Sequence, residues 1–271
     1  MIKQLRQWLY EPKVHGVDVD DNALLEVHAS ILREKRLLRS AFERFYRDMS
    51  MLCDRYFPVP GLEVELGTGA GFFKSMRPGL VTSDVRKGPH IDMELDAQAM
   101  ALRDESVRCL YAINVFHHLP DPERFFSELV RVLRPGGGCI LIEPHGGLAS
   151  AFLHKRLHSD EHFDLKAAGW RNIGILGPLS GANQALAHIV FQRDVERFQS
   201  LFGKQLEIVH RGFELNALRY LFSGGLNFRQ LLPSVTARPL EAIERLGSPF
   251  ARYWSLHQVI AVRKRTCTTN T

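Results

Sequence analysis

Three glycines alternate with other residues in the stretch "VELGTGAGFF", which begins at Val64. Gly67, Gly69 and Gly71 follow the acidic residue Glu65 at intervals of two residues. Glycines at a strand-to-helix turn let the backbone approach a ligand closely and direct amide N–H groups at it. The dinucleotide fingerprint needs G-x-G-x-x-G and the P-loop needs G-K-[ST], and this stretch has neither. The spacing therefore predicts a ligand site that uses neither of these two phosphate-binding patterns.

Side chains that could bind or react follow the later apolar segments. Asp84 ends "VTSD", Asp96-Ala97 follows "MEL", and Asn114 and His117-His118 lie in "AINVFHHL". A carboxylate accepts two hydrogen bonds at once, which suits a ligand with paired hydroxyls. An imidazole with an ordinary pKa can take a proton from a hydroxyl group. One of the two adjacent histidines, His117 or His118, is therefore a candidate general base, and the alternative is that they only support the pocket.

A second group of histidines begins just after the apolar segment 139–143, and it includes His145, His158 and His162. His158 and Glu161 are three residues apart, so on a helix they would share a face. With Asp164 they could hold a divalent metal ion. The spacing is not diagnostic of a metal site, and we expect a hydrogen-bonded cluster and no metal.

Short apolar segments alternate with helical ones between residues 61 and about 145. The helix is predicted over "DPERFFSELVRVL", where Pro122 suits the first turn and Pro135-Gly136-Gly137 ends the helix. Strands alternating with helices predict an α/β fold with a parallel sheet and right-handed crossovers. We expect strands at 62–66, 80–83, 91–94, 109–114 and 139–143, and two late strands at 205–213 and 256–264.

Two helical regions flank these strands. Between Asn22 and Tyr56 apolar residues recur at steps of three and four, so residues 1–58 are predicted as a helical N-terminal segment. The insert 214–255 is too long for a hairpin turn and is expected to pack as a helical flap. The domain division is therefore 1–58 and 59–271, with the insert inside the second part.

The ordered landmarks of this sequence resemble those of the class I S-adenosylmethionine-dependent methyltransferases, of the methyltransferase type 11 kind. The glycine turn is similar to their motif I, and "AINVFHHLPDPERFFSELVRVLRPGGGCILIEP" resembles their fourth strand, helix and fifth strand. The resemblance implies a Rossmann-like fold whose seven-stranded, mostly parallel sheet ends in an antiparallel strand, with helices on both faces, a helical N-terminal lid and a helical insert. It also implies S-adenosyl-L-methionine as cofactor. The cofactor-binding residues so implied are Glu65, Gly67, Thr68, Gly69, Gly71, Asp84, Asp96, Ala97 and Asn114.

The resemblance continues in "IEPHGGLASAFLHKRLHSDEHFD" and "GPLSGANQALAHIVFQRD", which are similar to a bacterial subfamily often found among polysaccharide and lipid-glycan genes. It implies O-methylation of a glycan, a lipid-linked molecule or another small hydrophobic acceptor. In this fold His145, His158 and His162 would lie on the acceptor side. Two alternatives stay open, a C- or N-methyltransferase of a natural product or quinone-like ring, and a non-catalytic module that only binds the cofactor.

The acceptor side is also where we expect aromatic residues from both helical regions. Most of these are expected in the core, and any that face the active site would form an apolar roof. Arg219, Arg229 and Arg238 would then meet a phosphate or carboxylate on the acceptor. The aromatic residues are Phe42, Phe45, Tyr46, Phe213, Tyr220, Phe222, Phe228, Phe250, Tyr253 and Trp254.

The bulk composition is that of a globular enzyme, with a net charge of +5 and 45% hydrophobic residues among 271. Basic residues form no long run, so nucleic-acid binding is not expected, whereas peripheral contact with an anionic membrane remains compatible with the charge. The four cysteines are scattered, and no signal peptide or membrane-spanning segment is evident, so a cytoplasmic location is expected. The oligomeric state is left open.

Overall fold

The computed structural model describes residues 8–157, 162–172, 177 and 181–266, and its centre is a seven-stranded sheet in the order β3-β2-β1-β4-β5-β7-β6. Strands β1 to β5 are parallel, and β7 runs antiparallel to both β5 and β6. The sheet confirms the predicted fold class, including the antiparallel strand at the end of the chain. The strands are β1 Leu62–Leu66, β2 Val81–Asp84, β3 Met93–Glu94, β4 Val107–Ile113, β5 Leu133–Pro144, β6 Leu206–Phe213 and β7 His257–Lys264.

The strand order reverses direction at β1, because β2 pairs on one side of it and β4 on the other. Loops leaving the carboxyl ends of two such strands turn to opposite faces of the sheet, which opens a crevice between them. The glycine turn after β1 and the loop after β4 therefore border the same crevice. This topology decides where a ligand can bind.

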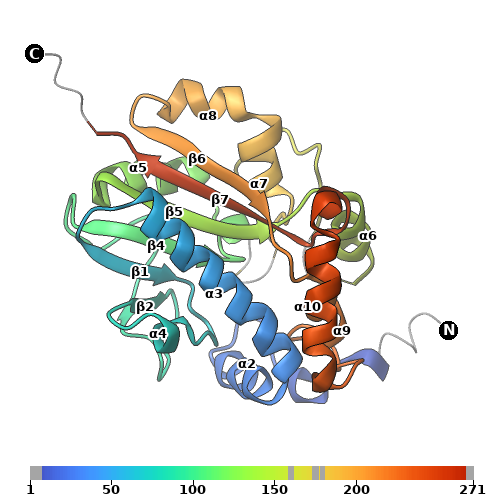
Figure 1. Cartoon of the computed structure of the whole chain (residues 1–271). Helices are drawn as coiled ribbons and strands as arrows, with labels where there is room; N and C mark the ends of the chain where they lie inside the picture. Colours follow the sequence, from blue (N-terminus) through green and yellow to red (C-terminus); the bar gives the residue numbers. More distant parts are fainter. Residues whose placement is uncertain (1–7, 158–161, 173–176, 178–180, 267–271) are drawn as a thin grey trace, which may run out of the picture.

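Helices cover both faces of the sheet (Figure 1). Helix α3, Arg36–Tyr56, crosses one face, and its Phe45, Met49 and Cys53 share a buried cluster with residues of β4, β5 and β7. The opposite face packs against α5, Pro122–Val132, the short α7, Leu186–His188, and α8, Val195–Phe202. The N-terminal helical region thus shares a hydrophobic core with the sheet and also reaches over its carboxyl edge.

Helix α2, Ala23–Glu34, precedes α3, and Lys35 breaks the helical backbone between them. Lys35 is buried, forms an ion pair with Glu11 at 2.9 Å and donates to the carbonyl oxygens of Gly225 and Phe228. A buried ammonium group needs such partners to offset its loss of hydration. Through these two hydrogen bonds Lys35 connects the N-terminal helices to the insert that precedes β7.

The insert is helical, as predicted, and contains α9, Ala217–Ser223, α10, Ala237–Leu246, and α11, Ala251–Trp254. Between α9 and α10 the chain forms an isolated antiparallel bridge in which Tyr10 faces Phe228. Hydrogen bonds from Glu11 N to Asn227 O (3.0 Å) and from Arg229 N to Leu9 O (2.7 Å) flank it. The remaining elements are η1 Pro12–Val14, α4 Phe73–Met76, η2 Phe116–His118, α6 Leu148–Leu157, η3 Ile189–Arg193, η4 Ser234–Thr236 and η5 Ser248–Phe250.

Two predicted boundaries were wrong. The long helix ends at Val132, before the proline–glycine stretch that was expected to stop it, and β5 begins at once with Leu133. Leu133 pairs with Val107, and the register then shifts before Gly138 pairs with Cys109. Strand pairing across this irregularity draws the proline and glycines into the strand, which local turn preferences do not predict. The third strand is also shorter than expected, at Met93–Glu94.

Candidate active site

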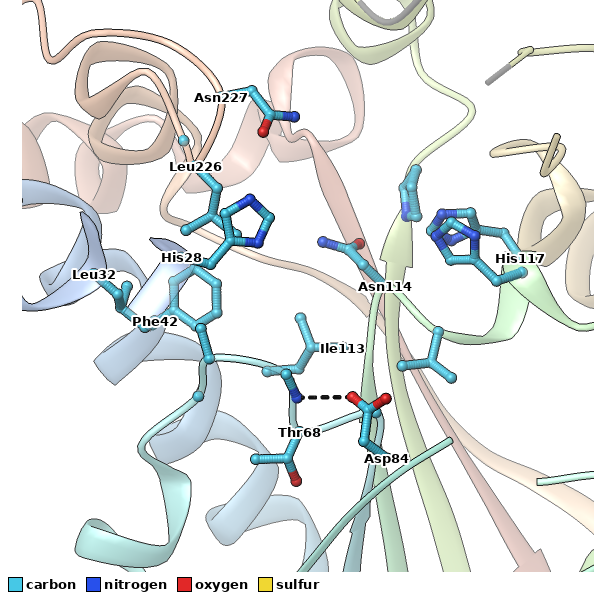
Figure 2. A pocket seen from close by; sticks show the side chains of 18 of the residues that line it. His28, Leu32, Phe42, Thr68, Asp84, Ile113, Asn114, His117, Leu226 and Asn227 are labelled. Carbon is cyan, nitrogen blue, oxygen red and sulfur yellow. Dashed lines mark hydrogen bonds between the residues drawn. The ribbon is translucent and has the colours of Figure 1, made fainter. Parts of the chain in front are cut away.

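A cavity of about 650 Å³ lies at the carboxyl ends of β1, β2 and β4. Its floor comes from the loops after these strands, and its roof comes from α2, α3 and the insert. Figure 2 shows the two sides facing each other, with His28, Leu32 and Phe42 opposite Asn114 and His117. Every residue predicted to bind the cofactor lines this cavity, as do His117 and His118.

The glycine turn requires glycine for two separate reasons. Gly67 and Gly69 have positive φ angles of 62° and 53°, which side-chain-bearing residues rarely adopt. A Cβ atom on Gly67 would also lie 2.5 Å from Val115 Cγ2, and one on Gly71 would lie 2.8 Å from the Tyr46 hydroxyl. The turn is thus closely packed between α3 and the loop after β4, with no room for a side chain at Gly67 or Gly71.

Asp84 lies at the end of β2 and faces the glycine turn. Its Oδ2 accepts from Gly69 N at 3.1 Å (Figure 2), and its Oδ1 accepts from Arg86 N at 3.0 Å. Arg86 Nε also donates to Oδ1, at 3.3 Å. These bonds hold the carboxylate toward the cavity, and the acceptor capacity left for a ligand is on Oδ2, because each carboxylate oxygen has two lone pairs. Asp96 and Ala97 follow β3, where Asp96 is exposed and accepts from Gln98 N at 2.8 Å.

Glu65 lies in the floor of the cavity and is almost completely buried. Thr68 Oγ1 donates to its Oε2 at 3.1 Å. Burial raises the pKa of Glu65 to about 8, the hydrogen bond from Thr68 opposes this rise, and the nearby charge of Asp84 adds to it. Near neutral pH Glu65 is therefore mostly protonated, and a ligand cation placed beside it would favour its ionised form.

Asn114 directly follows β4 and has a positive φ of 55°, an unusual conformation that asparagine tolerates better than most residues. Its Nδ2 lies 3.5 Å from His257 Nε2, while its Oδ1 is buried and has no hydrogen-bond partner within the described structure. A buried acceptor left unpaired costs free energy. The strained backbone and the unpaired oxygen together indicate that Asn114 Oδ1 can accept a hydrogen bond from a ligand.

His117 lies in the short helix η2 and is oriented by Glu143, the last charged residue of β5. His117 Nδ1 is 2.6 Å from Glu143 Oε2, and both residues are buried. Glu143 Oε1 also accepts from the backbone N–H groups of Val115 (2.9 Å) and Phe116 (2.8 Å). In the tautomer in which Nδ1 donates to this carboxylate, Nε2 is the ring nitrogen that can accept a proton.

Two other cavity histidines are held in the neutral form. Burial, reinforced by the charge of Arg86, lowers the pKa of His28 to about 4. Burial also lowers the pKa of His118 well below its usual range, and the charges of His117 and Arg86 act in the same direction. The ring centroids of His117 and His118 are 4.2 Å apart. A neutral imidazole can donate and accept one hydrogen bond each, so both residues can contact an uncharged acceptor.

The roof of the cavity is mainly apolar. Of the predicted aromatic roof, Phe42, Tyr46, Tyr220 and Phe228 line the cavity, and leucines from α2, α9 and the following loop fill the space between them. Phe45 is buried in the core, as expected for most of this set, whereas other members lie on the surface. The exposed members are Phe213, Phe250 and Tyr253.

The prediction that Arg219 meets an acceptor anion was wrong. Its guanidinium is buried against Glu244, with Nε 2.7 Å from Oε2, and it also donates to the carbonyl oxygens of Ser40 and Leu215. Arg229 does line the cavity, and Arg238 is exposed on α10. Arg219 therefore joins α3, α9 and α10, and this pairing explains how a charged side chain is tolerated in the interior.

His145 and His162 lie outside the cavity lining. His145 is buried outside the cavity lining, with Nε2 3.1 Å from Arg252 O, and burial lowers its pKa. His162 is exposed, and its backbone pairs with Ala182 and Gln184. His158 and Glu161 lie outside the described residues, and the described residues contain no cluster of three potential metal ligands. An acceptor role for these histidines stays a prediction.

Sequence reasoning missed Glu143 and His257. Glu143 could have been found from the sequence, because it is a charged residue that directly follows the apolar residues 139–142 near the end of a strand. Asp84 stands in a similar position at the end of β2. His257 begins β7 and contacts the rings of Phe45 and Tyr220 at centroid distances of 5.0 Å. Nothing in the local sequence distinguishes it, because its position depends on β7 pairing antiparallel beside β5.

A family model and two curated relatives that match this chain are described as methyltransferases. Residues 76–141 match the family described as "Methyltransferase domain". An uncharacterized methyltransferase of Mycobacteroides abscessus is 28% identical over 167 residues, covering 49% of this chain and 64% of that protein. Another, from Mycobacterium sp. strain JLS, is 32% identical over 110 residues, covering 34% of this chain and 44% of that protein. The matches span less than two thirds of these relatives.

The fold was also compared with solved structures. The crystal structure of the cyclase SpnF has a TM-score of 0.44 at 15% sequence identity, over 81% of each chain.

Proposed function

We propose that this chain, by family a class I S-adenosylmethionine-dependent methyltransferase, methylates an oxygen atom of a small hydrophobic, lipid-linked or glycan acceptor. The observation that carries the proposal is the His117–Glu143 pair, a buried imidazole with Nδ1 fixed by a carboxylate 2.6 Å away at the edge of an apolar cavity. This arrangement supplies a proton acceptor, which oxygen methylation needs and transfer to a nucleophile that carries no proton does not.

The residues present fit S-adenosylmethionine. The amino-acid part of this cofactor carries an ammonium group, and Glu65 and the unpaired Asn114 Oδ1 are buried acceptors in the same cavity. Asp84 would accept hydrogen bonds from the ribose hydroxyls, and Val85, half exposed beside it, offers an apolar surface for adenine. The glycine turn allows close approach without the lysine that a phosphate-binding P-loop supplies.

When bound, the cofactor supplies an already reactive methyl donor, so the protein has to place the acceptor in line with it and exclude water. The apolar roof formed by α2, α3 and the insert performs the second task. Neutral His28 and His118 can hydrogen-bond the acceptor without adding charge to the chamber. His117 would take the proton that the hydroxyl loses, and Glu143 acts as a positioning residue that stabilises the resulting imidazolium.

Calorimetric titration with S-adenosylhomocysteine, with NAD as a control ligand, tests the cofactor assignment. We expect micromolar binding of S-adenosylhomocysteine alone, a loss of at least about tenfold in Asp84→Ala, where charge-assisted hydrogen bonds disappear, and no loss in Asp104→Ala. Asp104 is a matched control because it is exposed and pairs with Arg131 away from the cavity. Failure of folded wild-type protein to bind would favour a degenerate site and remove the proposal.

Transfer of a labelled methyl group from the cofactor into a lipid extract and a water-soluble metabolite extract tests the acceptor class. Mass spectrometry of the labelled product identifies the atom that is methylated. Methylation of oxygen that depends on His117 is the expected result. Methylation of ring carbon or nitrogen that is unaffected in His117→Gln would replace this proposal with the C- or N-methyltransferase alternative.

A further inference from the structure

The segment that runs from η4 through α10 and η5 to α11 carries an apolar stripe on its outer surface. This stripe consists of six residues, of which three lie on α10 at steps of four and three, the period of a helix, and the other three lie on η4, η5 and α11. All six are exposed, and the five with large aliphatic or aromatic side chains are between 45% and 83% exposed. The stripe consists of Val235, Pro239, Ile243, Leu246, Phe250 and Tyr253.

A row of arginines runs beside this stripe. Arg238 and Arg245 are spaced by seven residues, or about two helical turns, so they share a flank of α10, and Arg252 is exposed on α11. The Arg252 guanidinium lies 4.5 Å from the centroid of the Tyr253 ring, and Arg245 pairs with Glu241 at 2.7 Å. The outer surface therefore combines apolar side chains with positive charge.

The insert packs against the protein through a different side from the stripe. The opposite side of the segment is the buried one, where Leu240, Glu244 and Ala251 face the protein. Glu244 pairs with Arg219 of α9, and α10 lies next to α9 (Figure 1). Since another side of the helix supplies the packing, the exposed stripe calls for a different explanation.

Exposed apolar side chains continue from the stripe onto α6, which packs against α11. Leu148 and Phe152 of α6 are 77% and 59% exposed. Two hydrogen bonds accompany this packing. His145, in the loop before α6, has Nε2 3.1 Å from Arg252 O of α11, and Ser150 Oγ of α6 donates at 3.2 Å to the carbonyl oxygen of Leu256, which follows α11. The apolar surface therefore extends over two neighbouring elements.

We propose that the 234–254 segment binds the surface of an anionic phospholipid membrane. Helices with an apolar side and flanking basic residues lie in the plane of the interface, with leucine and phenylalanine in the acyl region and basic residues at the headgroups. Tyrosine suits the boundary between the two, and each arginine near an anionic surface strengthens binding about fivefold. The arginine row favours anionic lipid over a second copy of this chain, whose matching surface would bring like charges together.

The stripe also leads to the cavity. Leu231, four residues before Val235, lines the cavity and is 49% exposed, and α6 contributes Leu153 to the lining while Phe152 points outward. Bound in this orientation, the protein would hold the cavity close to the lipid surface. This is a suitable position for an acceptor with a lipid tail, although membrane binding itself requires no methyl transfer.

Sedimentation with vesicles, in the absence of cofactor and acceptor, tests the proposal. Wild-type protein is expected to bind phosphatidylglycerol–phosphatidylcholine vesicles and to bind phosphatidylcholine vesicles at least about tenfold more weakly, with binding reduced by salt. Leu246→Ser with Phe250→Ser should reduce binding at least about tenfold. Arg238→Gln with Arg245→Gln should reduce it by a similar factor on the anionic vesicles and leave the weak binding to phosphatidylcholine unchanged.

The matched controls are Met51→Ser with Leu201→Ser, which removes exposed apolar side chains from α3 and α8, and Arg33→Gln with Arg124→Gln, which removes exposed charges elsewhere. Neither pair should change vesicle binding, and all variants should keep wild-type unfolding temperatures. The proposal is overturned if wild-type protein stays in solution with anionic vesicles, or if the stripe and control variants bind alike. Analytical ultracentrifugation showing a wild-type dimer that Leu246→Ser dissociates would assign the stripe to a second copy instead. Since no cofactor is present, these outcomes are independent of the methyltransferase proposal.

Discussion

Glu63 and Glu65 are two residues apart on β1, so their side chains project from the same face of the sheet, and yet their environments are opposite. Glu63, at the amino end, is surrounded by cations. Burial pushes its pKa upward, but hydrogen bonds from Arg77 and Tyr111 outweigh burial and leave the pKa lowered. Glu65, at the carboxyl end, has no such cation among its described partners, and its pKa is raised to about 8.

The amino end of the strand is a completed ionic network. Arg77 and Arg108 each contact both Glu63 and Asp54 of α3, and Tyr111 donates to Glu63 at 2.7 Å. Arg108 also donates to Phe57 O at 2.9 Å. This network joins α3 to β1 and β4 with charges that are already paired. The carboxyl end, by contrast, leaves Glu65 and Asn114 with acceptor capacity that the protein does not use.

The difference between the two ends of β1 separates residues that contribute to stability from residues that contribute to ligand binding. Polar groups that form hydrogen bonds or ion pairs with each other within the protein contribute to folding. Polar groups that are buried without a full set of partners lower the stability, and such groups concentrate at binding sites. If the comparison is correct, substitutions at the two ends should affect different measurements. The following predictions test it, and all of them use the full chain.

The largest effect is expected at the carboxyl edge, for His117→Gln. Removing a general base typically lowers kcat by about 10²–10⁴-fold. The unfolding temperature and the affinity for S-adenosylhomocysteine should change little, because the loss concerns proton transfer. Glu143→Gln should lower kcat less and displace the acidic limb of the pH–rate profile. A kcat unchanged in His117→Gln would show that no base is used at this position.

Glu65→Gln should weaken binding of S-adenosylhomocysteine by about 10–100-fold, as expected for loss of a charge-assisted hydrogen bond to the ligand ammonium. Titration calorimetry measures this directly. The unfolding temperature should be equal to that of the wild type or higher, since a neutral amide, unlike Glu65, does not have to take up a proton when it is buried. A large loss of stability without loss of affinity would mean that Glu65 is structural.

Glu63→Gln should show the reverse pattern. Replacing this carboxylate leaves Arg77 and Arg108 with weaker partners and should lower the free energy of unfolding by about 1–2 kcal/mol, measured by urea denaturation. Affinity for S-adenosylhomocysteine should remain within about twofold of wild type, since nothing on the cavity side changes. Equal losses of affinity in the Glu63 and Glu65 variants would contradict the separation of the two ends.

The last effect concerns the pH dependence of stability. Because the folded-state pKa of Glu65 is raised to about 8, the unfolded chain releases this proton near its usual pKa while the folded protein retains it. Between these two values the unfolded state binds fewer protons, so stability falls as pH rises, by about 1 kcal/mol per pH unit from this group. Urea denaturation of the ligand-free protein across this range should show that Glu65→Gln removes this contribution. A wild-type slope that the substitution leaves intact would show that Glu65 ionises normally.

Much of the fold follows from local sequence. The apolar segments predicted β1 with its observed bounds and both late strands within one residue, because strand periodicity and turn residues are local properties. The strand irregularity near Gly138 was not predictable in this way, since it depends on pairing with Cys109. Cys109 and Cys139, which lie in the apolar strands β4 and β5, are buried free thiols.

Periodicity alone also fails to say which side of a helix is buried. Phe250 and Tyr253 were expected mainly in the core, yet they lie on the outer surface of the insert while Leu240 and Glu244 face inward. A stripe at helical spacing fixes only that its members share a side. Whether that side meets protein or solvent is decided by the neighbouring helix, here α9.

The sequence by itself determined the ordered ligand landmarks, because a glycine turn and residues at strand ends are encoded within a few positions of one another. Only the tertiary structure decided that Glu143 would meet His117, that Arg219 would be buried against Glu244, and that Glu63 and Glu65 would have opposite pKa shifts. The physical reason is that hydrogen bonding and desolvation depend on distances between groups far apart in the chain, and these distances are set by how the helices and the sheet pack.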